Sequence, residues 1–213
     1  MNDLRSTISW LLLTLLGVVG AGAAVLGVSQ SPDNVPLATA VKNTLAARSY
    51  SMALTQSTAQ GKQSDYLVYQ APDRLGGYVV SGNKRTYVYV IGTTEYQSLT
   101  VSANTPTSHL VFYKQESQGA AALNPVRNYL HYASLAKHVT QSGSTYSFSL
   151  TQQGQVGKFT FTVSGNYVSA IDLTVQTSSV QLIISQVGTS PPVALPAGAK
   201  VVAAPTTGTG TPG

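Results

Sequence analysis

The sequence predicts an α+β domain in which about two helices cover a single curled antiparallel β-sheet, a half-barrel, preceded by one transmembrane helix. Three observations lead to this prediction: an uncharged apolar run near the N-terminus, two groups of short alternating runs, and a helical pattern before each group. The chain has 213 residues, which is enough for one sizeable domain with appendages.

The uncharged run is residues 8–28, with the sequence ISWLLLTLLGVVGAGAAVLGV. As a helix it spans about 31 Å, which matches the hydrocarbon core of a bilayer. We favour an uncleaved anchor over a cleaved signal peptide, for which the small residues at 21–24 would be an acceptable cleavage site. We therefore expect a cytoplasmic stub at residues 1–7 and a domain on the extracytoplasmic side of the cell membrane.

A first helix should follow directly after the anchor. Pro36 suits the first turn of a helix, and Leu37, Val41 and Leu45 recur on one face. Because the link between the anchor and this helix is only about seven residues, it reaches at most ~25 Å. The domain therefore stays close to the membrane.

Short runs rich in valine, tyrosine and leucine come next. Turn signals such as Ser-Gly-Asn-Lys separate them, and such close spacing predicts hairpins and an antiparallel meander. The predicted strands lie near residues 50–55, 65–70, 75–80, 85–91 and 95–99.

The middle of the chain is less regular. Residues 100–108 read as a loop, and the sequence HLVFYKQ that follows is compatible with another strand. Asn124 and Pro125 then supply a cap and a first-turn proline for a second helix.

The strands resume with cleaner alternation near residues 146–151, 159–164 and 171–176. Such strands have one buried face and one wet face, which predicts a sheet covered on one side. The domain should span residues 29–202, and the sequence AAPTTGTGTPG at 203–213 is typical of a disordered tail.

A sheet of nine or so twisted strands tends to curl, and two helices packed into the curl should leave a cavity. The alternation turns large apolar side chains of both groups of strands toward this cavity. The predicted lining consists of Met52, Leu54, Tyr87, Tyr89, Phe148, Phe161 and Leu173.

The many tyrosines of the first group of strands allow two interpretations. Tyrosine suits a half-buried strand and places its hydroxyl at the rim, and some of these rings could instead line the mouth of a ligand site. An acid and a base, Asp73 and Arg74, stand side by side after Pro72. On an extended chain neighbouring side chains point apart, so we interpret this pair as part of a turn.

Several classes of function are disfavoured. The chain has no cysteine, and His131 and His138 are too far apart along a helix to bind one metal, so we expect no metal site and no cofactor. The sequence has neither a Gly-x-Ser-x-Gly motif nor carboxylates at a paired spacing. It therefore indicates no catalytic residues, and we do not expect an enzyme. The net charge is +5, but the basic residues are scattered, which argues against a nucleic-acid partner.

Four stretches resemble the lipoprotein-carrier superfamily, which includes LolA and LolB, the mycobacterial LprG and LppX lipoproteins, and the RseB sensor domain. YLVYQAPDRL is similar to an early strand and proline corner, and TYVYVIGTTEYQSL to the strand after it. NPVRNYLHYASLAKHVTQSGSTYSFSL resembles the inserted helix with its following strand. VSGNYVSAIDLTV with VQLIISQVGTSPPVALP resembles the closing strands and a terminal proline segment. The resemblance covers roughly residues 35–196.

The resemblance implies a half-barrel whose cavity holds acyl chains, so that the partners would be lipids or the acyl chains of lipoproteins. This chain departs from the family pattern because it has an apolar anchor in place of a lipidated cysteine. Such a tether suits lipid hand-over at short range in its own membrane. The alternative is an anchored sensor or accessory subunit that binds a membrane-protein partner through the same fold.

Overall fold

The computed structural model describes residues 34–152 and 154–204. The predicted anchor at 8–28 and residues 205–213 of the predicted tail lie outside this part of the chain. Among the described residues, no helix has both the length and the hydropathy to cross a membrane.

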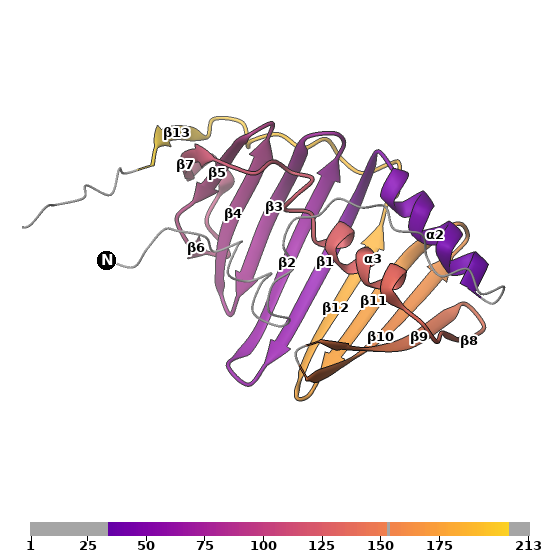
Figure 1. Ribbon diagram of the computed structural model, residues 1–213. Helices are drawn as coiled ribbons and strands as arrows, with labels where there is room; N and C mark the ends of the chain where they lie inside the picture. The colour runs from indigo at the N-terminus through magenta and orange to yellow at the C-terminus, as the bar shows by residue number, and fades with distance from the viewer. Residues whose placement is uncertain (1–33, 153, 205–213) are drawn as a thin grey trace, which may run out of the picture.

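One sheet of thirteen strands forms the body of the molecule, and its two end strands, β13 and β8, do not meet (Figure 1). The strand order is β13-β7-β5-β4-β3-β2-β1-β12-β11-β10-β9-β8, with the short β6 paired to β4. All pairings are antiparallel except that of β13 with β7. The predicted curled, open sheet with two helices is therefore confirmed.

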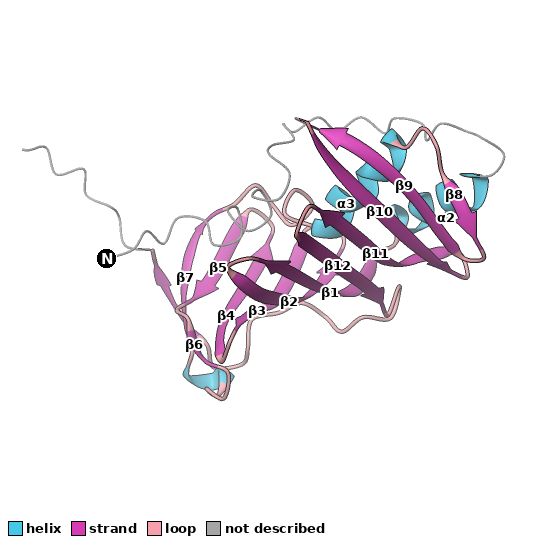
Figure 2. Ribbon diagram, turned by 90° about the horizontal axis from the view of Figure 1, so that it is seen from below, coloured by secondary structure: helices cyan, strands magenta, loops and turns pink. Residues whose placement is uncertain are grey.

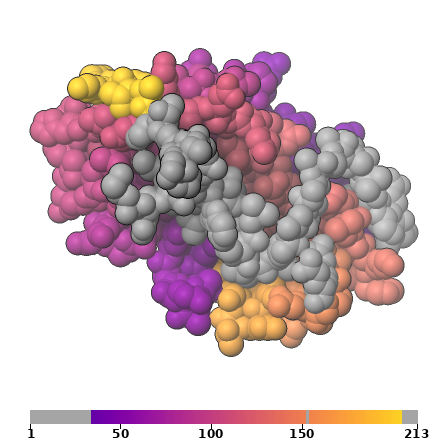
Figure 3. Space-filling model, turned by 60° about the vertical axis from the view of Figure 1, so that its left-hand side comes forward, coloured from indigo at the N-terminus to yellow at the C-terminus, as the bar shows by residue number. Residues whose placement is uncertain are grey.

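The strands divide into two arms that meet where β1 pairs with β12. The first arm contains β1 (Ser49–Thr58), β2 (Gly61–Gln70), β3 (Arg74–Ser81), β4 (Lys84–Ile91), β5 (Thr94–Ser98), β6 (Val101–Ser102) and β7 (Val111–Glu116). The second arm contains β8 (Thr140–Ser142), β9 (Thr145–Gln152), β10 (Gln155–Ser164), β11 (Tyr167–Val175) and β12 (Ser178–Ser185). The last strand, β13 (Lys200–Ala203), returns to the free edge of the first arm, where it lies on the surface (Figure 3).

Two helices, α2 (Val35–Ala46) and α3 (Pro125–Leu135), lie on the same face of the sheet, over the second arm (Figures 1 and 2). The α2 helix is tied to β11 by Thr44, whose hydroxyl donates to the Ala40 carbonyl and accepts from the Val168 N–H at 2.9 Å. Asn124 caps α3 by accepting a hydrogen bond from the Val126 N–H. Both helices begin as the sequence predicts, with a proline in the first turn.

The middle segment differs from the predicted loop in two details. It contains β6 and a short 3₁₀ helix, η2 (Thr107–His109), and the predicted strand after it is present as β7. The C-terminal segment then crosses the opposite face of the first arm, where Leu110 and Phe112 form a second buried cluster with Tyr87. The strand β4 is buried on both faces, because its apolar residues stand at successive positions: Tyr87 on this face, and Val88 and Val90 on the other.

Candidate functional site

The helix-covered face holds an apolar core shared by both arms. Five of the seven predicted lining residues lie in it, and none of them is more than 6% exposed: Met52, Leu54, Phe148, Phe161 and Leu173. Aromatic rings fill the space below α3, since Phe148 stacks on Phe159 with ring centroids 5.2 Å apart, and Tyr132 of α3 lies 5.0 Å from Phe159. In this conformation the predicted lining is packed against the helices.

The core continues into an open hollow of about 590 Å³ at the hairpin end of the same face. Figure 1 shows why this end is open: the hairpins of β1–β2, β9–β10 and β11–β12 extend past both helices. Val175 belongs to the core and also lines the hollow, so it marks the boundary between the two. Most of the lining is polar and uncharged, and it includes five glutamines: Gln56, Gln60, Gln63, Gln155 and Gln176.

A buried carboxyl group lies close to this boundary. Asp65 of β2 pairs across the sheet with Leu54, is 8% exposed, and accepts a hydrogen bond from Gln63 Nε2 at 2.9 Å. Burial raises the pKa of Asp65 to about 6, and the bond from Gln63 opposes that rise. Burial also raises the pKa of Tyr129 on α3, and the negative charge of the nearby Asp65 adds to this rise.

A single hydrogen bond fastens the start of α3 to the sheet. Asn124 Nδ2 donates to the Tyr50 hydroxyl at 2.6 Å, and both residues are buried. Asn124 thus bonds the helix with its oxygen and β1 with its nitrogen. Burial raises the pKa of Tyr50 above its ordinary value, so the group that accepts this bond is the neutral hydroxyl, through a lone pair of its oxygen.

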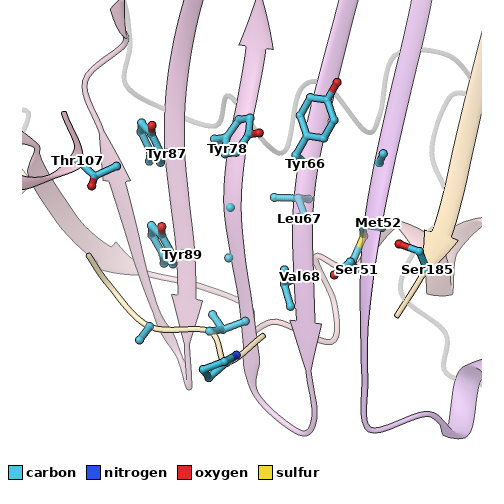
Figure 4. A pocket seen from close by; sticks show the side chains of 16 residues that line it. Ser51, Met52, Tyr66, Leu67, Val68, Tyr78, Tyr87, Tyr89, Thr107 and Ser185 are labelled. Carbon is cyan, nitrogen blue, oxygen red and sulfur yellow. The ribbon is translucent and has the colours of Figure 1, made fainter. Parts of the chain in front are cut away.

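A second depression, of about 560 Å³, lies on the face opposite the helices (Figure 4). Two rows of side chains in register across the strands form its floor. One row runs Tyr87, Tyr78, Tyr66 and Ala53, from β4 to β1. The other row runs Tyr89, Gly76, Val68, Ser51 and Ser185, from β4 to β12. We call this depression the tyrosine groove.

Gly76 leaves room for the neighbours that shape the groove. A Cβ atom at this position would collide with the ring of Tyr89 and lie 2.8 Å from Val193 Cγ1. Val193 belongs to the C-terminal segment that walls the groove and is 4% exposed. Its N–H donates to Gln70 Oε1, and its carbonyl accepts from Arg74 Nη1 at 3.1 Å. Asp73 lies in the turn before β3, as predicted, whereas Arg74 is the first residue of β3 and holds this segment.

An arginine flanks the row of tyrosines. The Arg85 guanidinium lies 4.1 Å from the centre of the Tyr78 ring, and its Nη1 donates to the Tyr87 hydroxyl. The same hydrogen bond raises the pKa of Arg85 above its ordinary value. Its Nε is buried without a hydrogen-bond partner among the described residues.

The structure therefore divides the seven predicted residues between two faces. Five are together in the core, whereas Tyr87 and Tyr89 lie in the tyrosine groove, where Met52 also contributes to the lining from its backbone side. Sequence reasoning gave no site role to Asp65 or Arg85, and it predicted Asn124 as the cap of the second helix but not its bond to Tyr50. The only signals were a carboxylate at an apolar position of β2 and a basic residue two positions before a strand tyrosine. Within the described residues, no three histidine, aspartate or glutamate side chains are grouped as a metal site.

No protein-family model matches the sequence, and no curated protein matches it significantly. Among the solved structures that match its fold are two mycobacterial proteins. LprF from Mycobacterium bovis has a TM-score of 0.52 and 14% identity, over 79% of this chain and 98% of that chain. The Mycobacterium tuberculosis lipoprotein LppX has a TM-score of 0.50 and 11% identity, over 78% of this chain and 100% of that chain. The chain therefore has the fold of LprF and of the lipoprotein LppX, which is the fold that the resemblance implied.

Proposed function

We propose that this protein is a membrane-anchored, extracytoplasmic lipid-binding domain that holds an acyl chain between its sheet and its helices. In this proposal residues 8–28 are the anchor, residues 29–202 are the binding domain, and the acyl chain displaces contacts of α3 with the core. The ligand class comes from the family resemblance, and the site comes from the geometry of the helix-covered face.

The continuity of the core with the polar hollow is the observation that carries the proposal. An amphiphile entering from the hairpin end would pass Val175 with its acyl chain directed under α3. Its polar head would remain among the glutamines of the hollow, which can donate and accept hydrogen bonds, beside Lys62, the one charged residue of the lining. The site thus has an apolar inner part and a polar entrance in the right order for a lipid.

The energetics allow reversible loading. Each buried CH₂ group of an acyl chain is worth about 0.8 kcal/mol relative to water. A chain that leaves a membrane is already buried, so the transfer itself is close to neutral. The cost that remains is the separation of α3 from the core, where Tyr129 and Tyr132 are each 8% exposed. A modest barrier of this kind suits a protein that takes up and releases its ligand.

Photo-crosslinking with a diazirine fatty acid tests the proposal on the full chain in phosphatidylcholine nanodiscs. We expect residue-level mass spectrometry to find label at the core and hollow boundary. Val175→Trp should obstruct the passage between hollow and core and reduce that label about tenfold. Thr174→Trp is the matched control, since its exposed side chain points to the other face of the same strand. Equal labelling of the two variants, with circular dichroism showing both folded, would reject this site.

The alternative is an anchored sensor or accessory subunit that keeps its core filled and binds a protein partner. The close packing of the five predicted lining residues favours it. A wild-type chain that acquires no label on the helix-covered face would support the sensor over the carrier.

A further inference from the structure

The tyrosine groove has no role in the proposed lipid site under the helices, and its shape and lining suit a ligand of its own. It lies on the other face of the sheet, and its floor crosses five adjacent strands, from Tyr87 and Tyr89 on β4 to Ser185 on β12. Four inter-strand spacings give it a length of ~19 Å. It is therefore an elongated surface groove rather than a small local depression.

The lining of the groove is mainly apolar and carries no charged residue. The rings of Tyr66 and Tyr78 lie 5.2 Å apart, and those of Tyr78 and Tyr87 lie 5.7 Å apart, so three rings form one continuous surface (Figure 4). Tyr66 is 44% exposed. Beyond Ala53 the same row continues on β12 with Ile183, which is 45% exposed.

The direction of the groove decides against an extended peptide. The groove runs across the strands, whose backbone N–H and C=O groups are already paired within the sheet. A peptide lying in it could not add a strand, because that mode of recognition needs a free sheet edge. Contacts must come from side chains, and aromatic and aliphatic side chains favour an apolar ligand of similar length.

Arg85 supplies the second feature of the ligand. Its guanidinium is held across the tyrosine row by Tyr78 and Tyr87, and no described carboxylate is among the groups that shift its pKa. A guanidinium prefers to pair with a carboxylate or phosphate group through more than one N–H donor. Its Nε is buried and out of reach of a head group, so the terminal nitrogens of this half-buried side chain would make the pairing.

We propose that the tyrosine groove is a second lipid site, which holds a single acyl chain along β4–β12 with an anionic head group at Arg85. The shared chemistry is a carboxylate or phosphate on an extended acyl chain. The site is separate from the one under the helices, because strand alternation places the two on opposite faces of the sheet.

The test uses the full chain in phosphatidylcholine nanodiscs with three diazirine probes: a free fatty acid, its methyl ester and a lysophosphatidate. We expect both anionic probes to label Tyr66, Tyr78 or Tyr87. Ala53→Trp should fill the groove and reduce this label at least about fivefold, while Thr174→Trp, exposed on the same face outside the groove, should leave it unchanged. Tyr66→Ala is a second groove variant in case Ala53→Trp does not fold.

The head-group arm uses Arg85→Gln. We expect it to reduce labelling by the two anionic probes about tenfold and labelling by the ester little, since a charge-assisted hydrogen bond is lost. If labelling by the fatty acid needs Arg85 and labelling by the lysophosphatidate does not, the site is assigned to carboxylates, and the reverse result assigns it to phosphates.

Absence of groove label in the wild type, or label unaffected by the groove variants, would overturn the site. Equal labelling by ester and acid would overturn the role of Arg85. Label at Val175 reports on the other face and separates failure here from failure of the proposed function.

Discussion

At the scale of single residues, Asp65 is the group whose chemistry is most altered by the fold. It lies between Leu54 and Val79 in the register of the helix-covered face, and the groups that face it are Gln63 and the Tyr129 hydroxyl of α3. No described cation contributes to its pKa, which burial raises to about 6. Near neutral pH the folded protein therefore carries a poorly solvated carboxylate beside the proposed lipid entrance.

This gives a signed prediction for stability. The pKa is about 6 in the folded state and near the ordinary aspartate value of 3.8 in the unfolded state, so the folded state binds more protons between these values. The free energy of unfolding should therefore fall as pH rises from about 4 to 6, by at most about 3 kcal/mol from this residue, and then level off. Asp65→Asn can still accept the bond from Gln63, so it should remove this part of the slope and be the more stable protein at pH 7.

Urea unfolding of both proteins at pH 4.5, 6 and 7.5 measures the effect. Burial raises the pKa of Glu95 as well, so some slope of the same sign should persist in Asp65→Asn. Glu95→Gln is the control that removes only that second contribution. If Asp65→Asn keeps the whole wild-type slope, Asp65 does not have the raised pKa described above.

At the scale of secondary structure, the face to which a side chain points could be predicted only where apolar and polar residues alternate along a strand. From Ile171 to Val175 in β11, apolar residues occupy alternate positions, so the orientation of Leu173 followed from the sequence. In β4, the run TYVYV is apolar at both parities, and the sequence alone could not tell which face Tyr87 and Tyr89 occupy. They lie opposite Val88 and Val90, which is why they were predicted together with residues of the other face.

The polar hollow was beyond sequence reasoning for a different reason. Its glutamines come from three hairpins, and each alone looks like an ordinary polar residue in or near a turn. Only the curl of the sheet brings Gln60 near Gln155 and Gln176. The two helices, by contrast, were predictable because caps and first-turn prolines are local signals.

The attachment of α3 gives a prediction at this scale. Tyr50→Phe keeps the ring, including its contact with Tyr69 at 5.2 Å, but leaves Asn124 Nδ2 buried without its acceptor. We expect a loss of about 1–3 kcal/mol in stability. We also expect faster amide hydrogen exchange within α3 and faster acyl labelling of the helix-covered face, because the helix separates from the core more often.

Tyr69→Phe is the control, since Tyr69 is equally buried beside Tyr50 but makes no contact with Asn124 among the described hydrogen bonds. It should leave exchange in α3 unchanged. If Tyr50→Phe speeds exchange in α3 without changing the rate of labelling, the helix is not the barrier to acyl entry.

At the scale of the whole molecule, the two faces of the sheet have different proposed tasks around the β1–β12 junction. Both arms and the helices form the core and the proposed acyl site, and the tyrosine groove lies on the opposite face, mostly on the first arm. Both sites include residues of β1, whose successive side chains alternate between them: Ala53 faces the groove and Leu54 faces the core. A lipid in one site could therefore alter the packing below the other.

The proposed tether sets how such a domain can deliver lipid. If residues 8–28 span the membrane, the link to α2 restricts the domain to within about 25 Å of the surface. A tethered carrier can reach an acceptor only when two membranes touch, so transfer between vesicles should increase linearly with acceptor concentration. A free carrier instead becomes limited by release of its lipid, and its rate should saturate.

A protease site inserted between residues 28 and 34 tests this in one preparation. Before cleavage, the protein should stay with the donor vesicles in flotation, and transfer of a fluorescent fatty acid should depend linearly on acceptor concentration. After cleavage the domain should enter the soluble fraction, and the rate should saturate because diffusion of the loaded domain replaces vesicle contact. A chain that is soluble before cleavage would show that residues 8–28 do not anchor it. A chain that is anchored but transfers with saturating kinetics would show that lipid leaves the domain spontaneously, without any need for contact with the acceptor membrane.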